Sequence, residues 1–229
     1  MPATPKPRQP LSRERIVDTA IALVDAEGLD ALTMRRLGAE LGMDPMAVYY
    51  YVPNKAALLD AVVEAVMAEI DLGVDDPSRP AEERLIRAAE AYAEVLVRHR
   101  NALPLLLVRG PATPAALAPV ELMVAILRGG GVPPERAVAG MHVLTAAVRG
   151  YAAIIANEMA NPGERDAEAL VALASPEQFP YLSEAAAQPR QDTQAAFELG
   201  LRAIAIGLLG VRGAERHSGG IDTVQADPA

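Results

Sequence analysis

The sequence predicts an all-α fold in which a small N-terminal helix-turn-helix domain precedes a larger helical domain. Aliphatic residues dominate a composition that is 51% hydrophobic and only 3% aromatic, which favours helix over strand. Apolar residues recur at helical spacing over most of the chain, and no segment alternates apolar and polar residues as a half-buried strand would. With 229 residues, the chain has room for two unequal domains.

The first four helices are predicted from capping residues and stop signals. They cover residues 12–28, 33–41, 45–51 and 54 to about 70. Gly28 and Gly42 provide the C-caps, and Pro45 suits the first position of the third helix. Each helix begins at a side chain that accepts hydrogen bonds from the free amides of the first turn, namely Ser12, Thr33, Asp44 or Asn54. One apolar stripe per helix predicts the buried face: Ile16, Ala20, Leu23 and Val24, then Leu37 and Leu41, then Leu58, Val62, Val66 and Ile70.

Four longer helices are predicted beyond a linker at residues 71–80. They cover about 81–100, 113–128, 134–157 and 193–209. Residues 161–191 are polar, small and interrupted by proline, which predicts a loop with a short helix near 167–174. The expected domain organisation is a flexible basic arm at 1–11, a helix-turn-helix domain at 12–56, a ligand-binding and dimerisation domain at 57–212, and a disordered tail at 213–229.

The charge of the chain is uneven. The net charge is −9, but residues 1–60 carry seven basic side chains against eight acidic ones, and residues 61–229 carry fourteen against twenty-two. An acidic balance opposes DNA binding, because phosphates are neutralised by Lys and Arg. Since most of the excess acid lies in the C-terminal part and the first fifteen residues are locally basic, a DNA partner stays compatible with the sequence.

Several classes of function are excluded by residues that the sequence lacks. Without cysteine there is no disulfide, cysteine-ligated zinc or thiol nucleophile. The three histidines show no metal-ligand spacing, and neither a P-loop nor a G-x-S-x-G motif occurs, so no enzyme is predicted. The apolar stretch 137–156 carries His142 and Arg149 and predicts a buried helix rather than a membrane span. We therefore expect a cytoplasmic protein with no cofactor, no metal and no membrane partner.

Two short helices joined by residues 42–44 have the arrangement of a helix-turn-helix. In such a motif the second helix protrudes, with small or apolar residues near base edges and polar atoms near phosphates. Tyr49, Tyr50 and Tyr51 point in directions spread over about 200 degrees, so at least one faces solvent or a ligand. Either one packs and the others are ordinary surface tyrosines, or two contact phosphates or thymine methyl groups, which is the interpretation we favour. Lys55 taken alone is equally an ordinary solvated lysine.

Two N-terminal segments carry a resemblance to a known family. Ile16 to Gly28, and LTMRRLGAELGMDPMAVYYYVPNKAALLDAV from Leu32 to Val62, resemble the tetracycline-repressor-like (TetR/AcrR) regulators in their caps, turn glycine, aromatic run and Asn-Lys pair. Met46, where many members have glycine, resembles the tetracycline-repressor branch. The resemblance implies double-stranded operator DNA as a partner, with contacts from Thr33, Met34, Arg35, Pro45, Met46, Ala47, Tyr49, Tyr50, Tyr51 and Lys55.

A weaker resemblance continues through residues 99–101, 109–111 and 150–158. In tetracycline repressors a histidine of helix 6 binds drug-chelated magnesium, and that position here is Leu106, while the acidic residue of the same site corresponds to Glu158. The resemblance therefore implies a largely apolar small-molecule effector in place of a magnesium–tetracycline complex. The candidate ligand-binding residues are Tyr92, His99, Leu106, Met123, His142, Tyr151 and Glu158, each of which on its own is as readily a core or surface residue.

The predicted helices at 134–157 and 193–209 are apolar over more than one face, which predicts a four-helix homodimer interface. Gly200 and Gly207 either allow close backbone approach there or merely weaken one helix. A homodimer binds a palindromic operator through the helix predicted at 45–51 of each subunit. A ligand that moves the helix predicted from residue 54 to about 70 changes the spacing of these two DNA-binding helices and releases the DNA. The sequence thus predicts a ligand-responsive DNA-binding transcriptional regulator, a repressor released by an inducer. The alternative is a helical protein-interaction module without specific DNA binding.

Overall fold

The computed structural model describes residues 10–110, 112–161, 175–188 and 192–210. Within these ranges every regular element is a helix, which confirms the all-α prediction. The α-helices follow in the order α1 (Arg13–Glu27), α2 (Met34–Leu41), α3 (Pro45–Tyr51), α4 (Lys55–Ala68), α5 (Ala81–Arg98), α6 (Leu103–Val108), α7 (Ala118–Gly129), α8 (Pro134–Ala160), α10 (Pro180–Ala186) and α11 (Thr193–Gly210). Short 3-10 turns are η1 (Leu29–Ala31), η2 (Leu72–Val74), η3 (Arg100–Ala102) and η4 (Ala115–Leu117).

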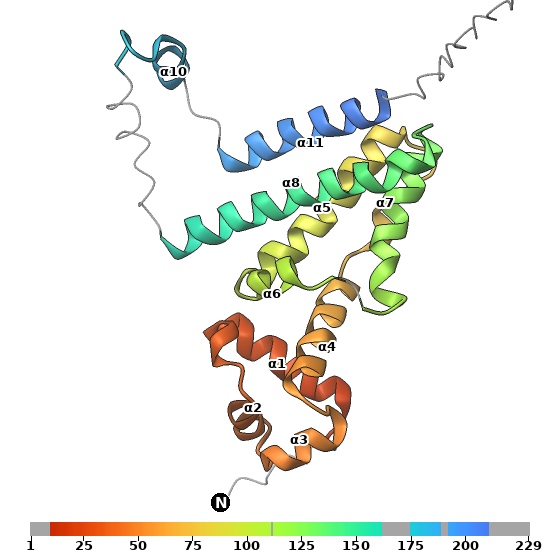
Figure 1. The fold of residues 1–229 in the computed structure, drawn as a ribbon, viewed down its shortest axis with the longest axis vertical. Helices are drawn as coiled ribbons and strands as arrows, with labels where there is room; N and C mark the ends of the chain where they lie inside the picture. The colour runs from red at the N-terminus through yellow and green to blue at the C-terminus, as the bar shows by residue number, and fades with distance from the viewer. Residues whose placement is uncertain (1–9, 111, 162–174, 189–191, 211–229) are drawn as a thin grey trace, which may run out of the picture.

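The helices form two parts joined by α4 (Figure 1). Helices α1, α2 and α3 make the small N-terminal part, and α4 runs from it towards the larger C-terminal bundle. In that bundle α5 packs against α7, α8 and α11, and α11 lies along α8. Helix α3 is at the end of the molecule farthest from α8 and α11, while α10 lies apart from the bundle.

The four predicted N-caps of the N-terminal part are present. The cap side chains accept hydrogen bonds from backbone amides: Ser12 Oγ from Arg15 at 3.2 Å, Thr33 Oγ1 from Arg36 at 3.1 Å, Asp44 Oδ1 from Met46 at 2.8 Å and Asn54 Oδ1 from Ala57 at 2.9 Å. The predicted stripes of α1, α2 and α4 are buried as expected. The start of each helix in the helix-turn-helix is therefore fixed by local chemistry.

Two glycines shape the turn between α2 and α3. Gly42 has φ 66 and ψ 34, the left-handed conformation that favours glycine at a helix C-cap. Gly38 is buried inside α2, and a Cβ atom there would lie 3.1 Å from both the Met43 carbonyl oxygen and the Pro45 nitrogen. The absence of a side chain at Gly38 thus allows the turn to fold tightly against α2, a role that the sequence analysis did not predict.

The C-terminal part differs from the predicted elements in three places. The helix predicted over 81–100 ends at Arg98, and a separate short helix, α6, follows with Pro104 in its first turn. Thr113 caps the 3-10 turn η4 through its hydroxyl, 3.4 Å from the Ala116 amide, so α7 begins only at Ala118. Helix α10 lies where a loop was predicted, and it begins at Pro180. The helix predicted near 167–174 and the predicted tail lie outside the described residues.

Helix α8 is long and apolar enough to cross a membrane by length and composition alone, and 28% of its most apolar window is buried. In the structure it lies within the bundle, where it packs against α5, α7 and α11. It also carries His142 and Arg149. These contacts are those of a bundle helix that keeps one long face uncovered.

Candidate nucleic-acid interface and ligand cavity

Helix α3 projects from the N-terminal domain with most of its surface uncovered (Figure 1). Val48 is its one buried residue and has no exposed surface. Tyr50 is 86% exposed and Met46 73%, and Tyr49 and Tyr51 are exposed as well. The rings of Tyr50 and Tyr51 meet edge to face with centroids 5.3 Å apart. All three tyrosines therefore face solvent, and none of their hydroxyls has a hydrogen-bond partner among the described residues.

The basic residues near α3 fall into two kinds. Arg36 is engaged within the fold, because its guanidinium contacts Glu27 at 2.6 Å and Glu40 at 2.8 Å, and the hydrogen bond that it donates to Glu27 raises its pKa. Arg35 and Lys55 are exposed and have no ion-pair partner in the described part of the chain. These two cations are the ones left available to neutralise phosphates.

The other predicted DNA-contact residues are placed unequally. Thr33 is exposed, and Pro45 and Ala47 are partly exposed at the start of α3. Met34 is 8% exposed, because its side chain packs into the domain core. A DNA contact at Met34 stays a prediction, and with the side chain buried it would involve the backbone amide in the first turn of α2, where amides lack helical partners.

A cavity of about 350 Å³ lies between α4, α5, α7 and α8, and it brings together three of the predicted ligand residues, Tyr92, Met123 and His142. Met67 on α4 and Ile70, just beyond the end of α4, also line it. Thr145 and Arg149 line it from α8, and Arg149 Nε donates a hydrogen bond of 2.9 Å to the Tyr92 hydroxyl. The site is an apolar chamber with a few polar groups, which is the usual composition of a small-molecule pocket.

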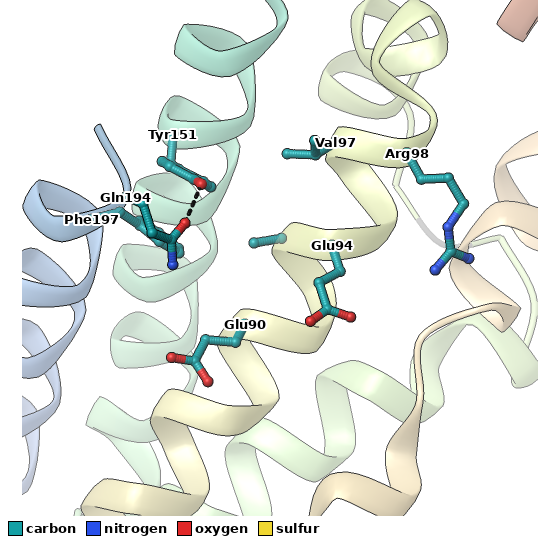
Figure 2. Close-up of a pocket in the computed structure, with 8 residues that line it drawn as sticks. Glu90, Glu94, Val97, Arg98, Tyr151, Gln194 and Phe197 are labelled. Carbon is teal, nitrogen blue, oxygen red and sulfur yellow. Dashed lines mark hydrogen bonds between the residues drawn. The ribbon is translucent and has the colours of Figure 1, made fainter. Parts of the chain in front are cut away.

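A second, larger groove of about 640 Å³ lies between α5, α8 and α11 (Figure 2). Glu90 and Glu94 of α5 face Tyr151 of α8 across it, and Tyr151 stacks on Phe197 with centroids 3.8 Å apart. Burial, together with the charges of Glu198 and Glu94, raises the pKa of Glu90, and burial likewise raises the pKa of Tyr151. Two carboxylates, the Arg98 guanidinium and two aromatic rings line this groove, whereas no carboxylate belongs to the described lining of the cavity beside α4.

Three predicted ligand residues line neither space. Leu106 is buried in the core of the bundle. Glu158 accepts a hydrogen bond from the Thr193 hydroxyl at 2.7 Å, which ties α8 to the start of α11. His99 is 4% exposed and lies between the two parts of the molecule. Among the described residues no group of three His, Asp or Glu side chains is placed to hold a metal ion.

His99 takes part in an interdomain clasp, which we define as His99, Asp25, Glu69 and Arg98. Its Nδ1 lies 2.8 Å from Asp25 Oδ2 of α1, and its Nε2 lies 3.0 Å from Glu69 Oε2 at the end of α4. Arg98 Nη1 donates to the same Glu69 oxygen at 2.9 Å. Burial would raise the pKa of Glu69, but the hydrogen bonds and charges of His99 and Arg98 outweigh burial and lower it. The clasp therefore joins the ends of α1, α4 and α5.

Helix α4 is tied to the C-terminal domain at further points. Asp60 forms an ion pair with Arg109, which follows α6. Glu64 accepts a hydrogen bond from the Thr113 hydroxyl at 3.0 Å. These contacts and the clasp lie along α4, between the helix-turn-helix at one end and the cavity at the other. A displacement of α4 at the cavity would therefore also move the helix-turn-helix domain that contains α3.

Sequence analysis missed several residues that line the cavity. Met67 and Ile70 belong to an apolar stripe that looks like ordinary core packing, and nothing in the sequence distinguishes them. Arg149 did leave a signal, since a lone arginine inside an apolar helix needs a reason to be there. The same arginine that argues against a membrane span also lines the cavity.

Two family descriptions match this chain. The bacterial regulatory proteins of the tetR family match at residues 16–62, and the tetracyclin repressor-like C-terminal domain matches at residues 76–212. Among curated relatives, the HTH-type transcriptional repressor DrrR1 of Streptomyces coeruleorubidus is 33% identical over 150 residues, which are 64% of this chain and 54% of that protein. The tetracycline repressor protein class E of Escherichia coli is 26% identical over 210 residues, which are 91% of this chain and 95% of that one. The chain thus matches about half the length of the first of these relatives and nearly all of the second.

Solved structures agree with this assignment. Apo ActR from Streptomyces coelicolor superposes with a TM-score of 0.78 at 32% identity, over 90% of this chain and 98% of ActR. ActR in complex with actinorhodin gives a TM-score of 0.77 at 33% identity, over 90% and 100% of the two chains. The chain therefore belongs to the tetR family of bacterial regulatory proteins, with a helix-turn-helix domain preceding a tetracyclin repressor-like C-terminal domain.

Proposed function

We propose that this protein is a homodimeric transcriptional repressor that binds a palindromic operator through α3 and releases it when a small molecule occupies the cavity beside α4. The observation that carries the proposal is the uncovered face of α3, where Met46 and three tyrosines surround a helix anchored by Val48. Free hydroxyls contact phosphates or base edges, and exposed apolar side chains contact thymine methyl groups. We assign residues 12–56 to DNA binding and residues 57–212 to ligand binding and dimerisation, in the cytoplasm.

The dimer is supported by apolar side chains on the uncovered faces of α8 and α11. On α11 the exposed Leu199 and Ile206 are two turns apart on one face, and Gly200 and Gly207 beside them have no atom within 4 Å of a Cβ position. Val143 and Ile154 are similarly exposed on α8. Packing these faces against the same faces of a second copy removes the apolar surface from water and places two α3 helices in successive major grooves.

Coupling between ligand and DNA is supported by the position of the cavity. Met67 and Ile70 belong to its wall and to the end of the helix that carries the DNA-binding domain. ActR, a relative of similar fold, has been solved with actinorhodin and with (S)-DNPA, which favours a small organic effector for this chain too. An effector that fits the cavity only when α4 is displaced shifts the population to a dimer with wrongly spaced recognition helices.

The test of DNA binding uses a matched pair of arginine variants. The probe is the duplex that flanks the gene of this protein, and retardation in a gel is measured over a range of salt concentrations. Arg35→Ala should weaken binding and reduce the slope of log K against log salt by about one unit for each phosphate contact removed. Arg136→Ala, which removes an exposed arginine at the start of α8, should change neither quantity.

The competing proposal is a helical protein-interaction module. It is favoured only by the acidic balance of the chain, with a net charge of −9. A module of that kind gives no retarded band at low salt with any duplex tested, and Tyr50→Ala leaves that result unchanged. A monomer in light scattering at micromolar concentration, with or without DNA, would refute the dimer arrangement.

A further inference from the structure

The cavity beside α4 contains a positive charge that has no negative partner. Arg149 lines it from α8, and among the described residues its one hydrogen-bond partner is the Tyr92 hydroxyl at 2.9 Å. No Asp or Glu belongs to the described residues that line the cavity. A guanidinium carries five donors, so Arg149 keeps its two terminal amino groups available.

Two other partly buried arginines among the described residues are paired with carboxylates. Arg84 makes a two-pronged contact with Asp75, at 2.7 Å and 2.9 Å, where both side chains are less than one-fifth exposed. Arg109 pairs with Asp60. Charges that leave bulk water are normally compensated in this way. Arg149 has no carboxylate partner among the described residues, and it faces an open cavity.

Tyr92 holds the guanidinium in a fixed position. The tyrosine is 2% exposed, so its ring is immobilised by packing, and its oxygen accepts the hydrogen bond from Arg149 Nε. The phenolic proton of Tyr92 then remains available as a donor. His142 and Thr145 precede Arg149 by seven and four residues on α8, so the three side chains share one helix face. The Thr145 hydroxyl donates to the His142 carbonyl at 3.1 Å, so the donors that remain for a ligand on this wall are those of Arg149, Tyr92 and the His142 ring, whereas Met67, Ile70 and Met123 make the rest apolar.

Resting on the proposed function, we infer that the effector of this protein is an amphipathic organic anion. Its apolar ring or chain lies against Met67, Met123 and Met141, and its carboxylate or similar acidic group accepts two hydrogen bonds from Arg149. Guanidinium and carboxylate match in the spacing of their donors and acceptors, which makes this pairing strong and directional. The net charge of −9 does not prevent it, because exposed charges are screened beyond about 8 Å at physiological salt.

The acidic groove between α5, α8 and α11 makes the opposite selection. Glu90 and Glu94 line it together with Arg98, whose charge is paired with Glu69, so the two carboxylates favour a cationic ligand there over an anion. The two spaces are therefore distinguishable by the charge of a probe molecule. An organic anion that binds with its affinity dependent on Arg149 must occupy the cavity beside α4.

The test uses two fluorescent probes that differ by one group. They are 1-anilinonaphthalene-8-sulfonate, which is anionic, and the neutral N-phenyl-1-naphthylamine, which lacks the sulfonate. Titrations are done on the full chain without DNA. The unmodified protein should bind the anionic probe at least tenfold more tightly than the neutral one. Arg149→Met should remove at least tenfold of the anionic affinity, equal to about 1.4 kcal/mol, and leave the neutral affinity within about twofold.

Two further variants control for folding and location. Arg136→Met makes the same chemical change on the exposed start of α8 and should leave both affinities unchanged. Tyr92→Phe removes only the hydroxyl that holds Arg149 and should weaken the anionic probe by about two- to fivefold. Circular dichroism and thermal unfolding establish that each variant is folded. If Arg149→Met does not fold, Arg149→Lys replaces it, and because this variant keeps the positive charge, it should still prefer the anionic probe.

Three results would overturn the inference. They are an unmodified protein with no preference for the sulfonate, an Arg149→Met variant that keeps the anionic affinity, and one that loses both affinities equally while folded. Because these titrations contain no DNA, they are independent of the proposed repressor activity. A protein that shows the predicted probe pattern but retards no duplex refutes the proposed function alone.

Discussion

Removal of the His99 imidazole is the most direct test of the interdomain clasp. Both ring nitrogens face carboxylate oxygens, Nδ1 towards Asp25 and Nε2 towards Glu69. Ionised carboxylates only accept, so in each of these contacts the ring nitrogen is the donor. His99→Leu fills a similar volume with apolar atoms and removes both bonds at once. It therefore separates the loss of hydrogen bonding from the creation of a cavity.

The magnitude follows from the two bonds and the exposure of their partners. A hydrogen bond to a charged group contributes about 1.5–3 kcal/mol. The Asp25 and Glu69 side chains are 31% and 36% exposed, so water recovers part of their hydration and the lower figure applies to each bond. We expect His99→Leu to lower the free energy of unfolding by about 3 kcal/mol, or Tm by about 6–12 °C.

The assay is urea unfolding at neutral pH, followed by circular dichroism at one fixed protein concentration, since dimerisation makes stability concentration-dependent. His142→Leu is the matched control, because the same substitution on α8 removes an exposed imidazole without a hydrogen-bond partner in the described chain. It should change the free energy of unfolding by less than about 0.5 kcal/mol. A double-mutant cycle of His99→Leu with Glu69→Gln should give a coupling energy of about 1.5 kcal/mol. Loss of less than about 1 kcal/mol in His99→Leu, or a coupling energy near zero, would refute the clasp.

Four further substitutions test other parts of the fold. Gly38→Ala should destabilise the fold by about 1–3 kcal/mol and weaken DNA binding, because the new Cβ atom meets backbone atoms at 3.1 Å. Gly150→Ala is the control, since open space surrounds that glycine and alanine should stabilise α8. Equal effects of the two substitutions in thermal unfolding would contradict this prediction. Glu90→Gln should stabilise by about 0.2–0.5 kcal/mol at pH 7, because it removes a charge that burial disfavours and that Glu198 and Glu94 repel. Since the folded state raises the pKa of Glu90, this gain should disappear below pH 4.5, where the carboxyl is protonated in both states, and a gain that persists there would point to another cause. Asp75→Asn should lower the free energy of unfolding by about 1–3 kcal/mol above pH 4. The hydrogen bond from Arg84 lowers the pKa of Asp75, so the stabilisation that Asp75 provides should be lost as the pH falls below 3.8, the ordinary pKa of an aspartate. A urea midpoint for the variant equal to that of the unmodified protein at pH 7 would disprove this prediction.

The N-terminal domain was predictable because its information is local. Ser12, Thr33, Asp44 and Asn54 each act on amides two or three residues away, and the turn at Gly42 depends on its own backbone conformation. The role of Gly38 was hidden, because it depends on the carbonyl of Met43 and on Pro45 folding back onto α2. That approach is a consequence of the turn and has no signature in the spacing of residues.

The ligand residues were less predictable because a cavity is made by side chains from distant helices. Tyr92, Met123 and His142 were selected as polar or polarisable residues in an aliphatic core, and they meet in one cavity. His99 was selected by the same criterion and instead bridges two carboxylates that lie 74 and 30 residues away in sequence. Composition identifies side chains that need a partner, but it does not say whether the partner is a ligand or the protein itself.

The attachment of α3 through a single buried side chain has an evolutionary consequence. Since Val48 alone of its seven residues is fully withdrawn from water, substitutions at the exposed Met46, Tyr49, Tyr50 and Tyr51 leave the packing of the domain largely intact. New operator sequences can therefore be acquired by changing the outer residues of α3 one at a time, without passing through unfolded intermediates. A gene duplicate of this protein would be free to acquire a different set of promoters while it keeps the same scaffold.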